Sequence, residues 1–164
     1  MEKRQIGLKL AMDGVGLPVN VEGFDDRLIL QKAIYLAQAA GVNFGYHYRW
    51  YLRGPYCPAV ADDGFAVSRE IKSGYDDSQR WKLDEISSGK LEGIRKLIGT
   101  RVATQELAKK LELLASVHFL VDKKQVSRPD SELITKKLKC FNKQFRKSKV
   151  EKSLELLRNH ELLS

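Results

Sequence analysis

The feature that most constrains the fold is a wide apolar stripe that begins just after an acidic pair at residues 25–26. Apolar side chains recur there over three turns at the spacing of an amphipathic helix. Either aspartate can cap the helix, and Gly41 can end it, because glycine adopts a left-handed backbone at little cost. The stripe is Leu28, Ile29, Leu30, Ala33, Ile34, Leu36, Ala37 and Ala40, and its polar exceptions are Gln31, Lys32 and Gln38. Its width predicts a helix at the centre of the core.

Other stretches of the chain carry the same helical spacing. A second long apolar helix is predicted from Thr104 to about Val121, and it is expected to form the other half of the core. Shorter helices are predicted over residues 1–12, 58–71, 88–98, 129–145 and 150–163. Pro58 and Pro129 suit helix starts, because the first helical residue needs no backbone donor. Gly64 leaves open a break in the helix over residues 58–71.

The clearest strand-like signal is an aromatic run over residues 46–52 that ends at Gly54-Pro55. Alternation along a strand predicts that one face packs on the core and the other is wetter. The core-facing set is Tyr46, Tyr48 and Trp50, and the wetter set is His47, Arg49 and Tyr51. The sequence therefore predicts a mainly α fold. We expect a compact single-domain helical bundle over residues 1–164 with a small aromatic β element, a β-hairpin or short strand, around residues 46–52.

Size, cysteine content and hydropathy narrow the class of protein. With 164 residues and a hydrophobic share of 43%, the chain is long enough to bury a full core without disulfides. Its two cysteines, Cys57 and Cys140, lack CxxC spacing, which fits a reducing cytoplasm. Neither a secretory signal nor a run of about 18 apolar residues is visible. We therefore expect a cytoplasmic protein with no membrane span.

The net charge of +8 is concentrated in one segment. Residues 123–152 contain 11 Lys and Arg side chains against three acidic ones, whereas the rest of the chain is balanced at 18 of each sign. Several of these cations recur at three- and four-residue intervals, which places them on one helical stripe. The stripe consists of Lys136, Lys139, Lys143, Arg146 and Lys147. It predicts either contact with a phosphate backbone, without readout of bases, or a solvated helix face that keeps the protein soluble.

Residues that could carry catalysis are scattered. His47, His118 and His160 lie far apart in sequence, and the adjacent aspartate pairs suit helix caps and turns better than a metal site. Cys57 with His47 would form a nucleophile–base pair only if their side chains came within hydrogen-bonding distance, which we do not expect. Neither of the glycine-rich phosphate-binding signatures is present. We therefore expect a non-enzymatic protein with no catalytic residue, no metal and no cofactor.

Aromatic and arginine side chains dominate the energetics of many interfaces, and both are concentrated in residues 46–58. The side chains of this run that we expect to contact a partner are Arg49, Tyr51, Arg53 and Tyr56. The prediction is that they anchor a protein partner, while the remaining aromatic side chains of the run pack on the core.

Two motifs in this order resemble a known family. Leu30-Gln31-Lys32 is followed by Tyr35 and Gln38, and Trp50 is followed by Gly54-Pro55 and Pro58. This arrangement resembles the Panacea domain, the SocA-like antitoxin family. Together with Leu113 to Leu120 it is closer to the YwgA-like branch of that family. Cys57 departs from the serine that the branch often has, and the basic segment is not part of the motif.

The resemblance implies a small, mostly helical domain that neutralises a toxin or serves as an adaptor. The motif positions that it transfers to this chain are Gln31, Lys32, Tyr35, Trp50, Gly54, Pro55 and Pro58, as structural positions or as contact residues. We expect a non-enzymatic protein-interaction module, an antitoxin or accessory protein of a mobile-element or defence locus, whose partner is a toxin or effector protein. The alternative is a nucleic-acid-binding protein that uses the basic C-terminal helices. The oligomeric state stays open.

Overall fold

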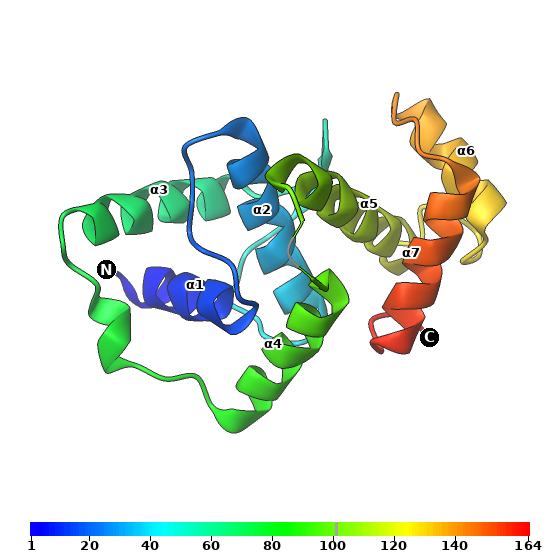
Figure 1. Ribbon diagram of the computed structural model, residues 1–164. Helices are drawn as coiled ribbons and strands as arrows, with labels where there is room; N and C mark the ends of the chain where they lie inside the picture. The colour runs from blue at the N-terminus through cyan, green and yellow to red at the C-terminus, as the bar shows by residue number, and fades with distance from the viewer. Residues whose placement is uncertain (101) are drawn as a thin grey trace.

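The computed structural model describes residues 1–100 and 102–164 and is mainly helical (Figure 1). The α-helices are α1 (Lys3–Gly14), α2 (Phe24–Ala39), α3 (Pro58–Lys72), α4 (Glu85–Ile98), α5 (Thr104–Asp122), α6 (Ser131–Cys140) and α7 (Lys147–Asn159), and a 3-10 turn, η1, spans Asp77–Arg80. Two short strands, β1 (Arg49–Tyr51) and β2 (Gly54–Tyr56), form an antiparallel hairpin. The predicted mainly α fold with a small β element is confirmed.

Helices α2 and α5 pack against each other at the centre of the molecule. Every residue of α2 from Leu28 to Ala37 is buried, and so is every residue of α5 from Leu111 to Leu120. Helices that are buried on all sides for ten consecutive residues have to be surrounded by other elements. α1, α3 and α4 cover α2, while α7 packs on α5 (Figure 1). Both predicted core helices are therefore confirmed.

Helix boundaries follow local chemistry at several points. The Asp84 carboxylate accepts a hydrogen bond from Ser87 N and begins α4, and Asp130 does the same for the first turn of α6. Pro58 is the first residue of α3, as predicted. α3 continues through Gly64 without a break. This residue lies so close to Leu30 of α2 that a Cβ would overlap the leucine side chain. That glycine allows two helices to approach each other.

The hairpin pairs Arg49 with Tyr56, Trp50 with Pro55 and Tyr51 with Gly54. It starts three residues later than the aromatic run, and its second strand contacts both core helices. The predicted alternation holds. Tyr46 is buried and Tyr48 and Trp50 are partly buried, whereas His47, Arg49 and Tyr51 are exposed.

Helices α6 and α7, the C-terminal helix pair, lie on the opposite side of the molecule from α1 and α3 (Figure 1). α7 packs against α5, and α6 packs against α7. α6 ends at Cys140, five residues earlier than predicted, because Asn142 has a left-handed backbone with φ of 58°. Lys143 and Arg146 therefore lie in the connection before α7. The stripe predicted on one continuous helix is interrupted there. Among the described residues, no helix is both long and apolar enough to cross a bilayer.

Candidate binding groove

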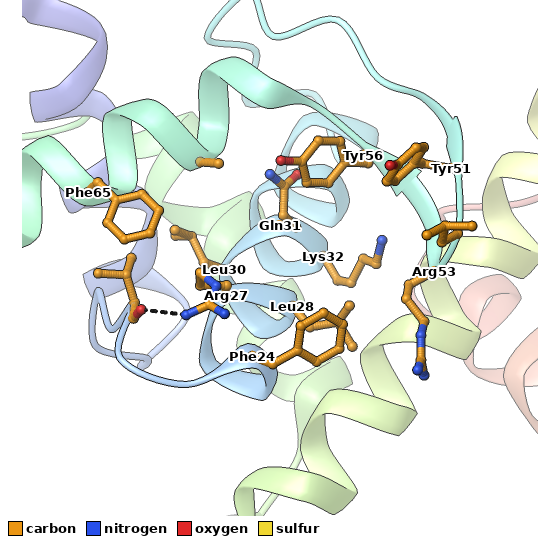
Figure 2. A pocket seen from close by; sticks show the side chains of 13 residues that line it. Phe24, Arg27, Leu28, Leu30, Gln31, Lys32, Tyr51, Arg53, Tyr56 and Phe65 are labelled. Carbon is orange, nitrogen blue, oxygen red and sulfur yellow. Dashed lines mark hydrogen bonds between the residues drawn. The ribbon is translucent and has the colours of Figure 1, made fainter.

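A cavity of about 580 Å³ opens on the surface where α2, the hairpin turn and α3 meet (Figure 2). We call it the hairpin groove. Helix α2 contributes Phe24, Leu28 and Leu30 on one side, the turn contributes Tyr51 to Arg53, and α3 contributes Phe65. Its volume lies within the range of roughly 300–1,000 Å³ that is usual for ligand sites.

The rim of the groove exposes large apolar side chains. Phe24 is 55% exposed and Leu52 74% exposed, and Tyr51 and Phe65 are also exposed. Of the nine large hydrophobic side chains that the described residues expose, these four line one cavity. Exposed apolar residues that gather in one place mark interaction sites more often than scattered ones do. The hairpin groove is therefore the place where the exposed apolar side chains of the described residues are most concentrated.

Two motif residues on α2 tie the hairpin to the core. The Gln31 side chain exchanges two hydrogen bonds with the backbone of Cys57, donating from Nε2 to O at 2.8 Å and accepting from N at 3.1 Å. Lys32 Nζ donates to Pro55 O at 2.6 Å. Both side chains lie at the floor of the groove and are buried. They satisfy backbone groups that the short hairpin leaves unpaired, so their role in the fold is structural.

Lys32 is only 1% exposed and belongs to a buried charge cluster with Glu112 and Lys143. Burial disfavours the charged ammonium and lowers the pKa of Lys32 to about 7, although Glu112 acts in the opposite direction. Glu112 itself accepts from Lys143 Nζ at 3.0 Å, with both side chains buried. The Lys143 ammonium also lies 6.0 Å from the centre of the Trp50 ring. The cluster joins α2, α5 and the connection between α6 and α7.

Gly54 combines a left-handed backbone, with φ of 91°, and a close approach to α5. A Cβ at this position would overlap Ser116 Oγ, which is buried and has no hydrogen-bond partner among the described residues. The hairpin turn therefore requires glycine for both conformation and space. Pro55 and Pro58 both follow the turn, Pro55 in β2 and Pro58 at the start of α3.

Tyr35 and Trp50 lie on the side of α2 and α5 away from the groove. The Tyr35 hydroxyl lies 2.7 Å from His118 Nδ1. Burial raises the pKa of Tyr35 and lowers the pKa of His118, so the phenol donates and the imidazole stays neutral. Tyr35 also packs edge-on against Tyr48, and Trp50 packs against Phe119. These contacts hold the aromatic run on the core.

The structure brings three of the four predicted partner-binding residues together. Tyr51, Arg53 and Tyr56 line the hairpin groove, and the Arg53 guanidinium lies 5.5 Å from the centre of the Phe24 ring. Arg49 is exposed but lines a different depression, formed with Trp50, Phe119 and Phe141.

Sequence reasoning missed Phe24 and Phe65. Phe65 lies on α3 between buried positions that form the helix's core face, Asp63-Gly64 and Val67-Ser68. A large apolar side chain such as Phe65 outside the core face of its helix is a sequence signal for a surface binding site.

The basic stripe is divided by burial. Lys136, Lys139, Arg146 and Lys147 are exposed, whereas Lys143 is buried against Glu112 and is not available to phosphates. Lys136 lies 3.7 Å from Glu132 one turn earlier, an exposed pair of small energetic weight.

Cys57 is buried and His47 is exposed, and no hydrogen bond joins them among the described residues. Within residues 1–100 and 102–164, no three His, Cys, Asp or Glu side chains gather as a metal site would require.

Comparisons of the chain with protein-family models, curated proteins and solved structures found no significant match.

Proposed function

We propose that this chain is a non-enzymatic protein-interaction module that binds a partner protein in the hairpin groove. The observation that carries the proposal is the apolar rim. Phe24, Tyr51, Leu52 and Phe65 remain exposed around one cavity, whereas the other large apolar side chains that the described residues expose lie outside it. Leaving such a surface in water is unfavourable, and a partner that covers it gains the free energy of burial.

The groove has the composition of a binding hot spot. Aromatic and arginine side chains line it, and they are the types that contribute most when an interface is truncated. Its floor is held by the hydrogen bonds of Gln31 and Lys32 to the hairpin backbone, so the surface is organised before binding. Pre-organisation lowers the entropic cost of association.

The motif resemblance supports a particular class of partner. Four of the residues that resemble the Panacea domain build the groove floor and the adjoining turn, namely Gln31 and Lys32 on α2 and Gly54-Pro55 in the hairpin, whereas Tyr35 and Trp50 lie away from the groove. We infer on that basis that the partner is a toxin or effector, and that the chain acts in the cytoplasm as an antitoxin or accessory protein of a mobile-element or defence locus.

The test is a tagged pull-down from the native host, with and without nuclease treatment, followed by affinity measurement with the recovered partner. Phe24→Ala with Phe65→Ala should weaken binding at least about thirtyfold, because each removes a large exposed anchor. The matched control is Tyr75→Ala with Trp81→Ala, which truncates two aromatic side chains of similar exposure outside the groove. Helical circular dichroism should be unchanged in both. Equal affinity for the groove variant and the wild type would contradict the proposal.

A second candidate function rests on the charge of the C-terminal helix pair. Four exposed cations, Lys136, Lys139, Arg146 and Lys147, lie on or between these helices. Such a surface can contact phosphates without base readout, with affinity that falls steeply as salt rises. Recovery of nucleic acid in the pull-down, with proteins lost after nuclease digestion, would favour this candidate.

A further inference from the structure

We infer that the hairpin groove recognises an acidic amphipathic segment of the partner protein, whose apolar side chains fill the cavity and whose carboxylate pairs with Arg53. This inference rests on the proposed function and specifies its chemistry. It combines three observations: the sign of the charges around the groove, the groups that each cationic side chain contacts, and the distance over which the exposed apolar side chains are distributed.

The charges around the groove have one sign. Two arginines, Arg27 and Arg53, line it together with Lys32, and none of the acidic side chains that the structure describes is part of the lining. The arginines supply most of the positive charge, because burial disfavours the charged form of Lys32 and Glu112 lies near it. Four acids neighbour the lining residues in sequence and none of them is part of the lining: Glu22, Asp25, Asp26 and Asp62. Glu22 pairs with Lys72, and Asp26 accepts a hydrogen bond from Gly23 N. A low-dielectric apolar wall lined by charges of one sign concentrates their field on whatever enters. The complementary occupant is anionic.

The three cations differ in what they contact. Arg27 donates to the backbone carbonyls of Val21 and Glu22, at 2.9 and 3.3 Å, and Lys32 donates to Pro55 O. Arg53 forms neither a hydrogen bond nor an ion pair with any residue the structure describes, and its guanidinium faces the Phe24 ring. A guanidinium can stack on a ring and still donate to a carboxylate from its edge. Arg53 is therefore the residue that can pair with an incoming acid.

The spread of the rim favours a protein segment over a small carboxylic acid. Tyr51 and Leu52 belong to the hairpin and are exposed. Phe24 and Phe65 lie on two different helices (Figure 2). A small ligand is enclosed by its pocket and would leave these outer side chains in water. An amphipathic segment laid across the groove covers them and brings an acidic flank to Arg53. Area and charge thus point to one occupant.

The experiment is selection of a random linear peptide library, displayed on phage, against the intact protein. The expected result is enrichment of peptides that combine leucine or phenylalanine with aspartate or glutamate. The affinity of a synthesised enriched peptide should fall about three- to tenfold for Arg53→Gln. Arg49→Gln is the matched control: it removes an exposed arginine from the same hairpin, outside the groove, and should leave the peptide's affinity unchanged.

Other outcomes would overturn the inference. They are enrichment of neutral or basic peptides, no enrichment at all, equal effects of the two arginine variants, or binding of dodecanoate with an affinity equal to that of the peptides. The proposed function is judged separately by the groove variant Phe24→Ala with Phe65→Ala. If that variant loses the native partner while Arg53→Gln does not, the groove is the interface and the acidic occupant is wrong. If neither variant affects the partner, both conclusions fall.

Discussion

The hairpin groove and the C-terminal helix pair present opposite kinds of surface. The groove exposes apolar side chains around a floor of tightly bonded polar ones, and only Arg53 among its cations lacks a partner in the described residues. Residues 123–152, which include α6 and the start of α7, carry the chain's excess charge, mostly on exposed lysine and arginine side chains. Exposed lysines are ordinary on protein surfaces, whereas gathered exposed aromatics are not. The difference teaches that the excess charge and the most distinctive surface of this chain lie in different places.

The two regions are connected inside the molecule. Lys143 comes from the basic segment, yet it turns inward to Glu112, whose charge also acts on Lys32 below the groove. One lysine of the basic segment therefore stabilises the core instead of facing solvent. The buried charge cluster is the point at which the comparison between the two regions can be tested most strongly.

The largest expected effect comes from Lys143→Met. It keeps an apolar stem of similar length but leaves Glu112 as a buried carboxylate without its ion-pair partner, so the free energy of unfolding should fall by about 3–5 kcal/mol. Denaturant unfolding followed by circular dichroism measures it. Lys147→Met, an exposed neighbour, should change stability by no more than about 0.5 kcal/mol. Adding Glu112→Gln to Lys143→Met should recover part of the loss.

Equal stability of the two lysine variants would contradict this account, since Lys143 would then behave like any exposed member of the basic segment.

An effect of intermediate size is expected from Lys32, as a change in pH dependence. Its pKa is about 7 in the folded protein against 10.5 ordinarily. Between these values the unfolded chain binds more protons, so stability should rise with pH, by at most about 1.4 kcal/mol per pH unit. Above about pH 10 three tyrosines reverse the trend, because burial raises the pKa values of Tyr35, Tyr46 and Tyr48.

Urea unfolding at several pH values between about 7 and 9 measures this slope. Lys32→Met should flatten it, and it should also lower stability at all pH values because Pro55 O loses its donor. The slope distinguishes the two effects. Loss of the hydrogen bond to Pro55 alone would lower the free energy of unfolding equally at every pH and would leave its dependence on pH unchanged. Lys90→Met removes an exposed lysine and should leave the slope unchanged.

Local patterns were sufficient to predict the main elements of the fold. The wide apolar stripe from Leu28 to Ala40 indicated a central helix because few other arrangements can bury it, and Pro58 marked the start of α3. The aromatic alternation also gave the correct inner and outer faces of the hairpin. In each case the signal lay within a short stretch of sequence and matched a single structural period.

The groove and the buried charge cluster could not be predicted in the same way. Phe24 and Phe65 lie 41 positions apart and come together only because Gly64 lets α3 approach α2. Lys143 lies in the connection because α6 stops at Cys140 before Asn142, whose backbone is left-handed. Asparagine tolerates this conformation and can mark a helix end, but it does not show that the following lysine is buried. Both features depend on tertiary packing, which no local pattern records.

The smallest expected effect is that of removing the exposed part of the basic stripe. Lys136→Gln, Lys139→Gln, Arg146→Gln and Lys147→Gln together should change the free energy of unfolding by no more than about 0.5 kcal/mol, because exposed charges and exposed ion pairs contribute little. Recovery of the protein partner should be unchanged, since these residues lie outside the groove. Binding to a labelled DNA duplex, measured by fluorescence anisotropy over a range of salt, completes the test. Duplex affinity that disappears in this variant, together with loss of the native partner, would reverse the comparison and make the C-terminal helix pair the functional surface.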